Sequence, residues 1–465
     1  MDRGIADQAN AVGGAVGDGY REASEFAARG PSQARFLKLY RLLSIVAWPL
    51  LLLYYLLMVL IGRKYRGNFL YRMGLKPPRR LPPGERIWFH ALSVGETLSV
   101  VPLVRAVRRL CPSLEIIFST ATEAGQEIAR KRLTGDINHL LYLPHDFPFI
   151  ADLYVQRLHP ALFVLVETDI WPNLLHSLKS RNIGTALVNA RLSPRSADRF
   201  RNLSRFFSPC DCFDLIFPQS SQDRQRFLEL GATCGQMQGP GNLKFDSLSP
   251  LVSGEEQNDL RTAAGIAAGR LVWIAGSTHP GEESMLLQVH RKLQTVYPDL
   301  LLIIAPRQVA RKDEIAALAK NLGLTTAARS AGVSEGNRDV YLLDTLGELG
   351  KFYALADVAF IGGSLVPFGG HNPLEAIAQS KPCIWGPHLF NFRDLEAGLL
   401  TAGCGAQVST EAQLLSVLQD WLGDAAFREQ ARQNAKRFLA SSTGCAQRIA
   451  QVLCETMDCS RRRGH

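Results

Sequence analysis

From residue 86 onward, short runs of apolar residues alternate with longer stretches in which apolar and polar residues repeat at helical spacing. A short run that is apolar throughout is typical of a strand buried on both faces of a parallel sheet. The amphipathic stretches between the runs are typical of helices that cover such a sheet. The predicted strands are RIWFHAL (86–92), LEIIFST (114–120), LFVLVE (162–167), GTALVNA (184–190), LIFPQS (215–220), LVWIAGS (271–277), LLLIIAP (300–306), VYLLD (340–344), VAFIGGS (358–364) and KPCIWG (381–386).

A segment rich in glycine and proline at 238–242 divides this series into two halves. Strands alternating with helices on both sides of the break predict an α/β protein with two Rossmann-like domains, whose parallel sheets face a cleft. We expect the domains to span 67–245 and 246–430. A closing segment, 431–465, follows and ends in a basic tail. The amphipathic stretch 424–454, which overlaps this segment, predicts one long helix.

The N-terminal part of the chain has a different pattern. Residues 1–34 are rich in Gly and Ala without an apolar period and predict a mobile tail. The uncharged apolar run at 42–61 then has the length that a helix needs to cross ~30 Å of hydrocarbon. It starts late and lacks a small-residue cleavage site, so a signal peptide fits poorly. A buried core helix is the alternative, but Trp48 and Pro49 suit a membrane better, and we assign 35–66 as a membrane-anchor segment.

Basic residues flank the apolar run on both sides and are denser after it. The positive-inside bias therefore places the large C-terminal body in the cytoplasm. With positive charge on both sides, a helix lying in the membrane plane fits as well as a spanning one. The net charge of +9 suits an anionic partner such as a membrane surface or a phosphorylated substrate. No long Lys/Arg tract with interleaved aromatic residues is present, so nucleic acid is the least favoured partner.

The cysteines and glycines exclude several classes of site. The nine cysteines are scattered and form no C-x-x-C motif, so neither a zinc site nor a disulfide framework is predicted. The body of the chain is accordingly expected in a reducing compartment. Neither a P-loop nor a G-x-G-x-x-G motif is present, which argues against an ATPase. We expect no metal and no cofactor.

Ligands of open α/β sheets bind beyond the carboxyl ends of the strands. The first such loop is SVGE (93–96), where a strand is expected to give way to a helix. Ser93 and Glu96 have the spacing of a capping box, in which each side chain bonds a backbone amide at the helix start. Alternatively, the turn presents Glu96 as a general base. The motif alone leaves both interpretations open.

The second half of the chain carries hydroxyl and basic residues at the corresponding positions. Ser277 and Thr278 follow a strand and precede a helix, so their hydroxyls either cap that helix or hold phosphate oxygens. Arg307 follows the next strand and would either bind a phosphate or form a surface ion pair.

The segment FGGHNPLE (368–375) is the richest of these loops. Its two glycines, Gly369 and Gly370, would let backbone amides approach a ligand closely. Asn372 can cap the helix, and Pro373 suits its first position. Glu375 would accept hydrogen bonds from a ribose diol, or it would only complement the helix dipole.

The strings SVGE, ETDIWPN, NARLS, GNLKFD, AGSTHPGEE, APR, GGHNPLE and GPHLFNF occur in this order behind a basic, apolar anchor. Over about 35–448 this ordered set strongly resembles the 3-deoxy-D-manno-octulosonic acid (Kdo) transferase family of lipopolysaccharide assembly. The resemblance implies a GT-B fold, a CMP-Kdo donor, a lipid A precursor of the lipid IVA type as acceptor, inversion at the anomeric carbon, and no metal. It also implies a location at the inner membrane of a Gram-negative cell envelope.

The resemblance assigns roles to individual positions. Glu96 corresponds to the proposed general base, and Glu167, which opens ETDIWPN, to a second functional carboxylate. We place Ser93, Thr122 and Arg191 on the acceptor side. The donor-side positions are Ser277, Thr278, Arg307, Gly347, Gly369, Gly370, Asn372 and Glu375.

The sequence departs from the family pattern at two places. The family's APR is commonly followed by His-Pro, whereas Gln308 and Val309 follow here, and Ala376 stands where proline is frequent.

Three other functions are alternatives to Kdo transfer. The chief alternative is another membrane-associated GT-B glycosyltransferase that uses a UDP-sugar donor. A sugar-nucleotide epimerase would need no anchor. A membrane-tethered scaffold would bind the nucleotide without turnover.

Overall fold

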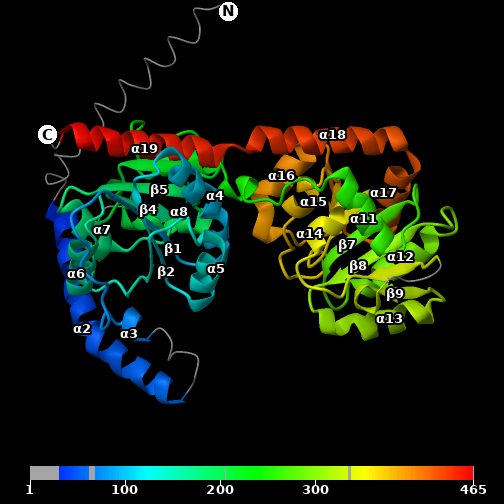
Figure 1. Cartoon of the computed structure of the whole chain (residues 1–465), viewed down its shortest axis with the longest axis horizontal. Helices are drawn as coiled ribbons and strands as arrows, with labels where there is room; N and C mark the ends of the chain where they lie inside the picture. The colour runs from blue at the N-terminus through cyan, green and yellow to red at the C-terminus, as the bar shows by residue number, and fades with distance from the viewer. Residues whose placement is uncertain (1–30, 62–68, 205, 333–336, 464–465) are drawn as a thin grey trace, which may run out of the picture. The chain divides into compact units, whose positions relative to one another are not determined.

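The structure is a computed structural model, and it describes residues 31–61, 69–204, 206–332 and 337–463 (Figure 1). The chain forms two compact units. Unit 1 contains the chain up to Ser247 together with the segment from Thr443 onward, and unit 2 contains Leu248–Ser442. Most of the predicted N-terminal tail lies outside the described residues.

Unit 1 is built on a six-stranded parallel sheet in the order β3-β2-β1-β4-β5-β6. All six residues of β1 are buried, which explains why the strand has large apolar residues, such as Trp88 and Phe89, on both of its faces. The strand order changes direction between β1 and β4, and the loops after such neighbouring strands diverge and leave room for a ligand. The strands are β1 (Arg86–Ala91), β2 (Glu115–Thr120), β3 (His139–Tyr142), β4 (Leu162–Val166), β5 (Gly184–Ala190) and β6 (Leu215–Pro218).

Helices cover both faces of this sheet, with an apolar cluster between each face and its helices. The C-terminal helix α19 (Cys445–Arg463) packs along α4 and contributes Ile449 and Leu453 to one of these clusters. The other helices of the body are α3 (Phe69–Arg72), α4 (Val94–Leu110), α5 (Glu123–Leu133), α6 (Pro148–Leu158), α7 (Pro172–Lys179), α8 (Pro194–Leu203), α9 (Ser221–Glu229) and α10 (Leu243–Asp246).

The apolar N-terminal segment forms a long helix, α2 (Pro31–Ile61). By length and composition, Ala34–Met58 could cross a bilayer. One face of α2 nevertheless packs on α6 and α7, and it brings Trp48 and Tyr55 against the apolar cluster of unit 1. Other apolar side chains of α2, including Leu50, are exposed. The predicted N-terminal apolar helix is therefore present, and one of its faces packs against the body of unit 1.

Unit 2 is built on a seven-stranded parallel sheet in the order β13-β12-β11-β7-β8-β10-β9. Apolar clusters again fill the space on both faces. The strands are β7 (Val272–Thr278), β8 (Leu301–Pro306), β9 (Thr326–Ala328), β10 (Val340–Leu342), β11 (Val358–Ile361), β12 (Cys383–Trp385) and β13 (Gly405–Gln407). The helices are α11 (Gly254–Ala263), α12 (Glu283–Leu293), α13 (Lys312–Asn321), α14 (Leu349–Phe352), α15 (Leu374–Ala378), α16 (Arg393–Thr401), α17 (Glu411–Gly423) and α18 (Ala425–Ser442).

The expectation of one closing helix over 424–454 is wrong. The segment forms α18 in unit 2 and α19 in unit 1, separated by Thr443 and Gly444. Gly444 has a left-handed φ of 84°, a conformation that glycine adopts readily and that interrupts a helix. Asp246, at the end of α10, caps the start of α19, because its carboxylate accepts the backbone N–H groups of Gly444 and Ala446, each at 2.6 Å.

Candidate active site

Glu96 lies at the start of α4, directly after β1, and it takes part in the helix cap. Ser93 Oγ accepts the N–H of Glu96 at 3.3 Å. In return, the Glu96 carboxylate accepts the Ser93 hydroxyl at 2.8 Å and the N–H of Leu92 at 2.6 Å. The capping interpretation is therefore confirmed, although the amide that Glu96 bonds belongs to the residue before the N-cap.

The same carboxylate has the electrostatics of a base. Glu96 is only 7% exposed. Burial, with a smaller contribution from the charges of Glu167 and Asp169, raises its pKa to about 7 against the opposing hydrogen bonds from Leu92 and Ser93. A general base works best when its pKa lies near the working pH. Capping and proton acceptance are thus compatible at this position.

Glu167 follows β4, the strand beside β1. Its φ of 60° is left-handed, as is the φ of 53° at Asn189 near the end of the neighbouring β5. Non-glycine residues in this conformation store about 1–3 kcal/mol of strain each, and such residues cluster at functional sites. Burial raises the pKa of Glu167, and the positive charges of Lys244 and Arg191 oppose the rise.

The structure brings the other acceptor-side positions to the same edge of the sheet. Thr122 caps α5 by accepting the N–H of Gly125 at 3.1 Å, and its hydroxyl lies 3.5 Å from the carbonyl oxygen of Leu92. The carbonyl oxygen of Arg191 accepts the hydroxyl of Thr168, which follows Glu167. The loops after β1, β2, β4 and β5 therefore meet at the carboxyl ends of their strands.

Two further residues of unit 1 lie beside this site: Asn189, which opens NARLS but received no role from the sequence, and Lys244, for which the sequence left a linker and a cleft position both open. Asn189 is fully buried, and its Oδ1 accepts the N–H of Leu243 at the start of α10 at 3.1 Å. This bond places α10 and its Lys244 close enough to lower the pKa of Glu167. An asparagine that ends an apolar run is a usable signal, because asparagine tolerates left-handed backbone conformations.

In unit 2, the predicted donor-side residues other than Gly347 lie at the carboxyl ends of β7 and β8 and in the segment that follows β11. Ser277 has a left-handed φ of 58°. Thr278 is buried, and its Oγ1 has no hydrogen-bond partner among the described residues. The carbonyl oxygen of Thr278 accepts the N–H of Arg307 at 2.9 Å, which fixes the start of the loop that carries the exposed guanidinium.

The GGHNPLE segment lies next to Arg307. Desolvation raises the pKa of Glu375 although part of its side chain is exposed, and the charge of Arg307 opposes the rise. Asn372 Oδ1 accepts the N–H of Leu374 at 3.1 Å, so the predicted cap is present. The helix itself begins one residue later than expected, at Leu374, and Pro373 precedes it.

The two glycines of this segment are explained by packing. Gly369 and Gly370 have left-handed φ values of 95° and 73°. A Cβ on Gly369 would lie 2.4 Å from Asn391 Nδ2, and one on Gly370 would lie 2.4 Å from Leu389 Cδ1. The GGHNPLE and GPHLFNF motifs therefore fit together only with glycine at these positions. Gly347 lies apart from them, in the exposed loop after β10.

Glu282 and a histidine pair organise these loops and were not singled out from the sequence. Glu282 is fully buried, and its carboxylate accepts four backbone N–H groups at 2.7–3.0 Å. These amides belong to His279, which follows β7, and to Gly363, Ser364 and Leu365, which follow β11. The acidic pair that ends AGSTHPGEE was the available signal.

His279 and His371 lie with their Nε2 atoms 2.8 Å apart. Burial, together with the charges of His279 and Arg307, lowers the pKa of His371 to about 4. One neutral imidazole can donate a hydrogen bond to the other across this distance. The pair thereby joins the loop after β7 to the GGHNPLE segment.

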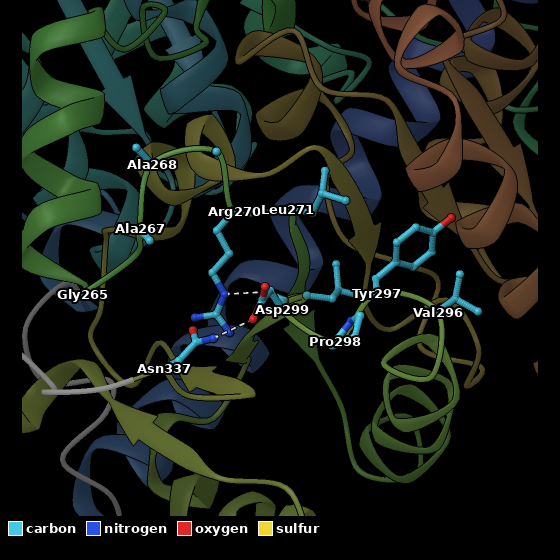
Figure 2. A pocket seen from close by; sticks show the side chains of 12 residues that line it. Gly265, Ala267, Ala268, Arg270, Leu271, Val296, Tyr297, Pro298, Asp299 and Asn337 are labelled. Carbon is cyan, nitrogen blue, oxygen red and sulfur yellow. Dashed lines mark hydrogen bonds between the residues drawn. The ribbon is translucent and has the colours of Figure 1, made fainter.

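A pocket of about 750 Å³ lies elsewhere in unit 2 (Figure 2). It is lined by residues at the amino ends of β7 and β8, including Arg270 and Asp299. The guanidinium of Arg270 donates to the carbonyl oxygens of Asp299 and Arg338, so these donors already have partners within the protein. None of the predicted donor-side residues lines this pocket. Among the described residues, no group of three or more His, Cys, Asp or Glu could hold a metal.

Solved structures show the fold class of this chain. The glycosyltransferase from Rickettsia africae ESF-5 matches with a TM-score of 0.54 and 10% identity, over 81% of this chain and 99% of that one. The likeness at this identity concerns the fold alone. Together with the two parallel α/β units, it shows that the chain has a GT-B fold.

Sequence relatives narrow the class to a family. The family model described as 3-Deoxy-D-manno-octulosonic-acid transferase (kdotransferase) matches residues 67–247. The 3-deoxy-D-manno-octulosonic acid transferase of Haemophilus influenzae is 34% identical over 417 residues, which are 89% of this chain and 97% of the relative. That of Bordetella pertussis is 33% identical over 392 residues, covering 82% and 89%. The chain belongs to the Kdo transferase family, and the resemblance found in its motifs is confirmed.

Proposed function

We propose that this glycosyltransferase moves Kdo from CMP-Kdo to a lipid A precursor of the lipid IVA type, with inversion at the anomeric carbon. Membership of the Kdo transferase family supports the donor sugar and the pathway. The observation that carries the chemistry is Glu96, a buried carboxylate whose pKa is raised to about 7 beside a second acidic loop.

In this proposal the acceptor's sugar hydroxyl attacks the anomeric carbon of Kdo. A bond forms between the hydroxyl oxygen and that carbon, and the bond from the carbon to the phosphate oxygen of CMP breaks. The hydroxyl proton goes to Glu96, and CMP leaves with the bonding electron pair. A phosphate leaving group needs electrostatic stabilisation more than a proton, and the exposed guanidinium of Arg307 is suited to supply it.

Each unit receives one substrate in this scheme. Unit 1 would bind the acceptor beside Ser93, Thr122, Glu167 and Arg191. The negative charge of Glu167 would also keep the pKa of Glu96 high enough for it to take a proton. Unit 2 would bind CMP-Kdo through Ser277, Thr278, Arg307, Gly347, Gly369, Gly370 and Asn372, with Glu375 accepting the ribose hydroxyls.

The same proposal places the protein on the cytoplasmic side of the inner membrane. The exposed apolar residues of α2 would enter the lipid, whereas its other face packs on α6 and α7. A helix held along a folded body in this way favours lying in the membrane plane over spanning the membrane. The net charge of +9 would add attraction to an anionic membrane surface.

The direct test uses the full-length protein with CMP-Kdo and a tetraacylated lipid A precursor in lipid vesicles. We expect release of CMP and a lipid product that carries added Kdo by mass spectrometry. Parallel reactions receive UDP-sugars in place of CMP-Kdo. Release of UDP with a glycosylated lipid would favour the alternative GT-B enzyme, and donor binding without any product would favour a scaffold.

A further inference from the structure

The α2 helix makes a specific polar contact with unit 1 in addition to its apolar packing. The hydroxyl of Tyr40 donates to Asp146 at 3.1 Å. The same carboxylate accepts the backbone N–H groups of Asn173 and Leu174, both at 2.9 Å, and so caps the start of α7. The loop that carries Glu167 runs directly into this helix start. Tyr40 is therefore joined to the end of that loop through one side chain.

A second contact starts from the other end of the same helix. The hydroxyl of Tyr55 lies 3.0 Å from His145 Nε2. Arg72 Nη2 lies 3.3 Å from Nδ1 of this imidazole, and Arg72 Nη1 donates to the carbonyl oxygen of Ala121. Arg72 Nη2 also lies 3.4 Å from Nε2, and because arginine only donates, the imidazole accepts from Arg72 and exchanges a second hydrogen bond with the Tyr55 hydroxyl. Ala121 is the residue before Thr122, so this series of hydrogen bonds ends in the acceptor-side loop that carries Thr122.

The two series of hydrogen bonds pass through two adjacent residues, His145 and Asp146, between β3 and α6. Burial lowers the pKa of His145 to about 4, with the Arg72 charge adding, and burial raises the pKa of Asp146 to about 6. Desolvated polar groups of this kind are retained in a fold only when they are satisfied. A helix that served solely as an anchor would need apolar surface alone, and these phenol contacts exceed that need.

We propose that Tyr40 and Tyr55 are positioning residues, through which α2 sets the geometry of the loops that carry Glu167 and Thr122. Attachment to the membrane and arrangement of the acceptor side would then depend on one helix. The proposal rests on the acceptor role given above to unit 1. The two tyrosines act through Asp146 and through His145 with Arg72, and none of these five residues needs to touch the substrate.

The test is the double variant Tyr40→Phe/Tyr55→Phe in the full-length protein. Both substitutions remove a hydroxyl and leave the aromatic packing of α2 in place. Tyr54→Phe is the matched control, since it makes the same chemical change on the neighbouring tyrosine, whose side chain is 50% exposed. The single variants Tyr40→Phe and Tyr55→Phe separate the contributions of the two series of hydrogen bonds. The measurements are kinetics against each substrate, co-sedimentation with anionic vesicles, and melting temperature.

We expect kcat/KM for the vesicle-borne lipid acceptor to fall by roughly 5- to 150-fold, the usual range for coupling between sites. The KM for CMP-Kdo, vesicle binding and the Tyr54→Phe enzyme should be unchanged. Unaltered acceptor kinetics would overturn the proposal, and so would a fall that tracks lost vesicle binding or a general loss of folding. A wild-type protein without any Kdo transfer would refute the proposed function itself, which is a separate result.

Discussion

Replacing Glu96 by glutamine separates proton acceptance from helix capping. The amide oxygen of glutamine can accept the N–H of Leu92, and its NH₂ group can donate to Ser93 Oγ. Both cap contacts of the wild-type side chain therefore have a counterpart in the variant, and glutamine is an accepted residue at this capping-box position. The fold should be preserved, while the group that takes a proton is removed.

The effect on stability follows from the pKa of Glu96, which rises from an ordinary value of 4.5 to about 7. At ~1.4 kcal/mol per pKa unit, the ionised carboxylate destabilises the folded state by up to ~3 kcal/mol. For an acid whose folded pKa is raised, this loss is absent below pH 4.5 and complete above about pH 7. The variant has no carboxylate, so it should be more stable than wild type at pH 8, and the difference should shrink towards pH 4.5.

The effect on turnover should have the opposite sign. General-base catalysis contributes about 10²–10⁴-fold, so kcat of Glu96→Gln should fall at least ~100-fold while CMP-Kdo binding is retained. The wild-type rate should rise with pH to a plateau above about pH 7, as the carboxylate ionises. Initial rates from pH 5.5 to 8.5, with melting curves at each pH, check both parts. Near-normal turnover in a well-folded variant, with the same rise in rate, would leave Glu96 as a helix cap alone.

Three further changes test other parts of the site. Arg307→Ala should raise the KM for CMP-Kdo about 10- to 100-fold, because a charge-assisted hydrogen bond contributes ~1.5–3 kcal/mol; an unchanged dependence on donor concentration would remove Arg307 from the donor site. Ser93→Ala removes a hydrogen bond that lowers the pKa of Glu96, so the rise in rate should move to higher pH, and loss of the cap should destabilise the protein by ~1 kcal/mol; a profile at its wild-type position would contradict this. Deleting 1–66 uncovers the surface of α6 and α7, so the truncated protein should melt at a lower temperature and aggregate, and a monodisperse product with native melting would show that α2 is dispensable for folding.

The long central strands could be predicted from the sequence because burial on both faces forces an apolar run. All the predicted strands are present. The missed strands, β3, β9 and β13, each span only three or four residues and lie at or next to the edges of their sheets. The four residues of β3 are all only partly buried, and its apolar run, Leu140 to Tyr142, is too short to distinguish a strand from a helix segment.

The site was predictable where its chemistry is local in sequence. Ser93 and Glu96 lie three residues apart, and their spacing alone indicates the cap that the structure contains. By contrast, Tyr40 and Asp146 are separated by 106 positions, and nothing in either neighbourhood indicates the partner. Glu282 likewise bonds amides more than 80 positions away, in a loop whose place depends on the sheet order.

The cap and the proposed base role of Glu96 are compatible, because the hydrogen bonds of the cap also act on the pKa of the carboxylate. Burial and the charges of Glu167 and Asp169 raise the pKa of this carboxylate, and the hydrogen bonds from Leu92 and Ser93 lower it. Without the cap, the group would hold its proton at neutral pH and could accept none from a substrate. Without burial and the acidic neighbours, it would ionise readily but bind a proton too weakly to help the reaction. Holding a carboxylate at a helix start therefore fixes its orientation and, in the proposed role of Glu96 as a base, adjusts its pKa near neutral pH.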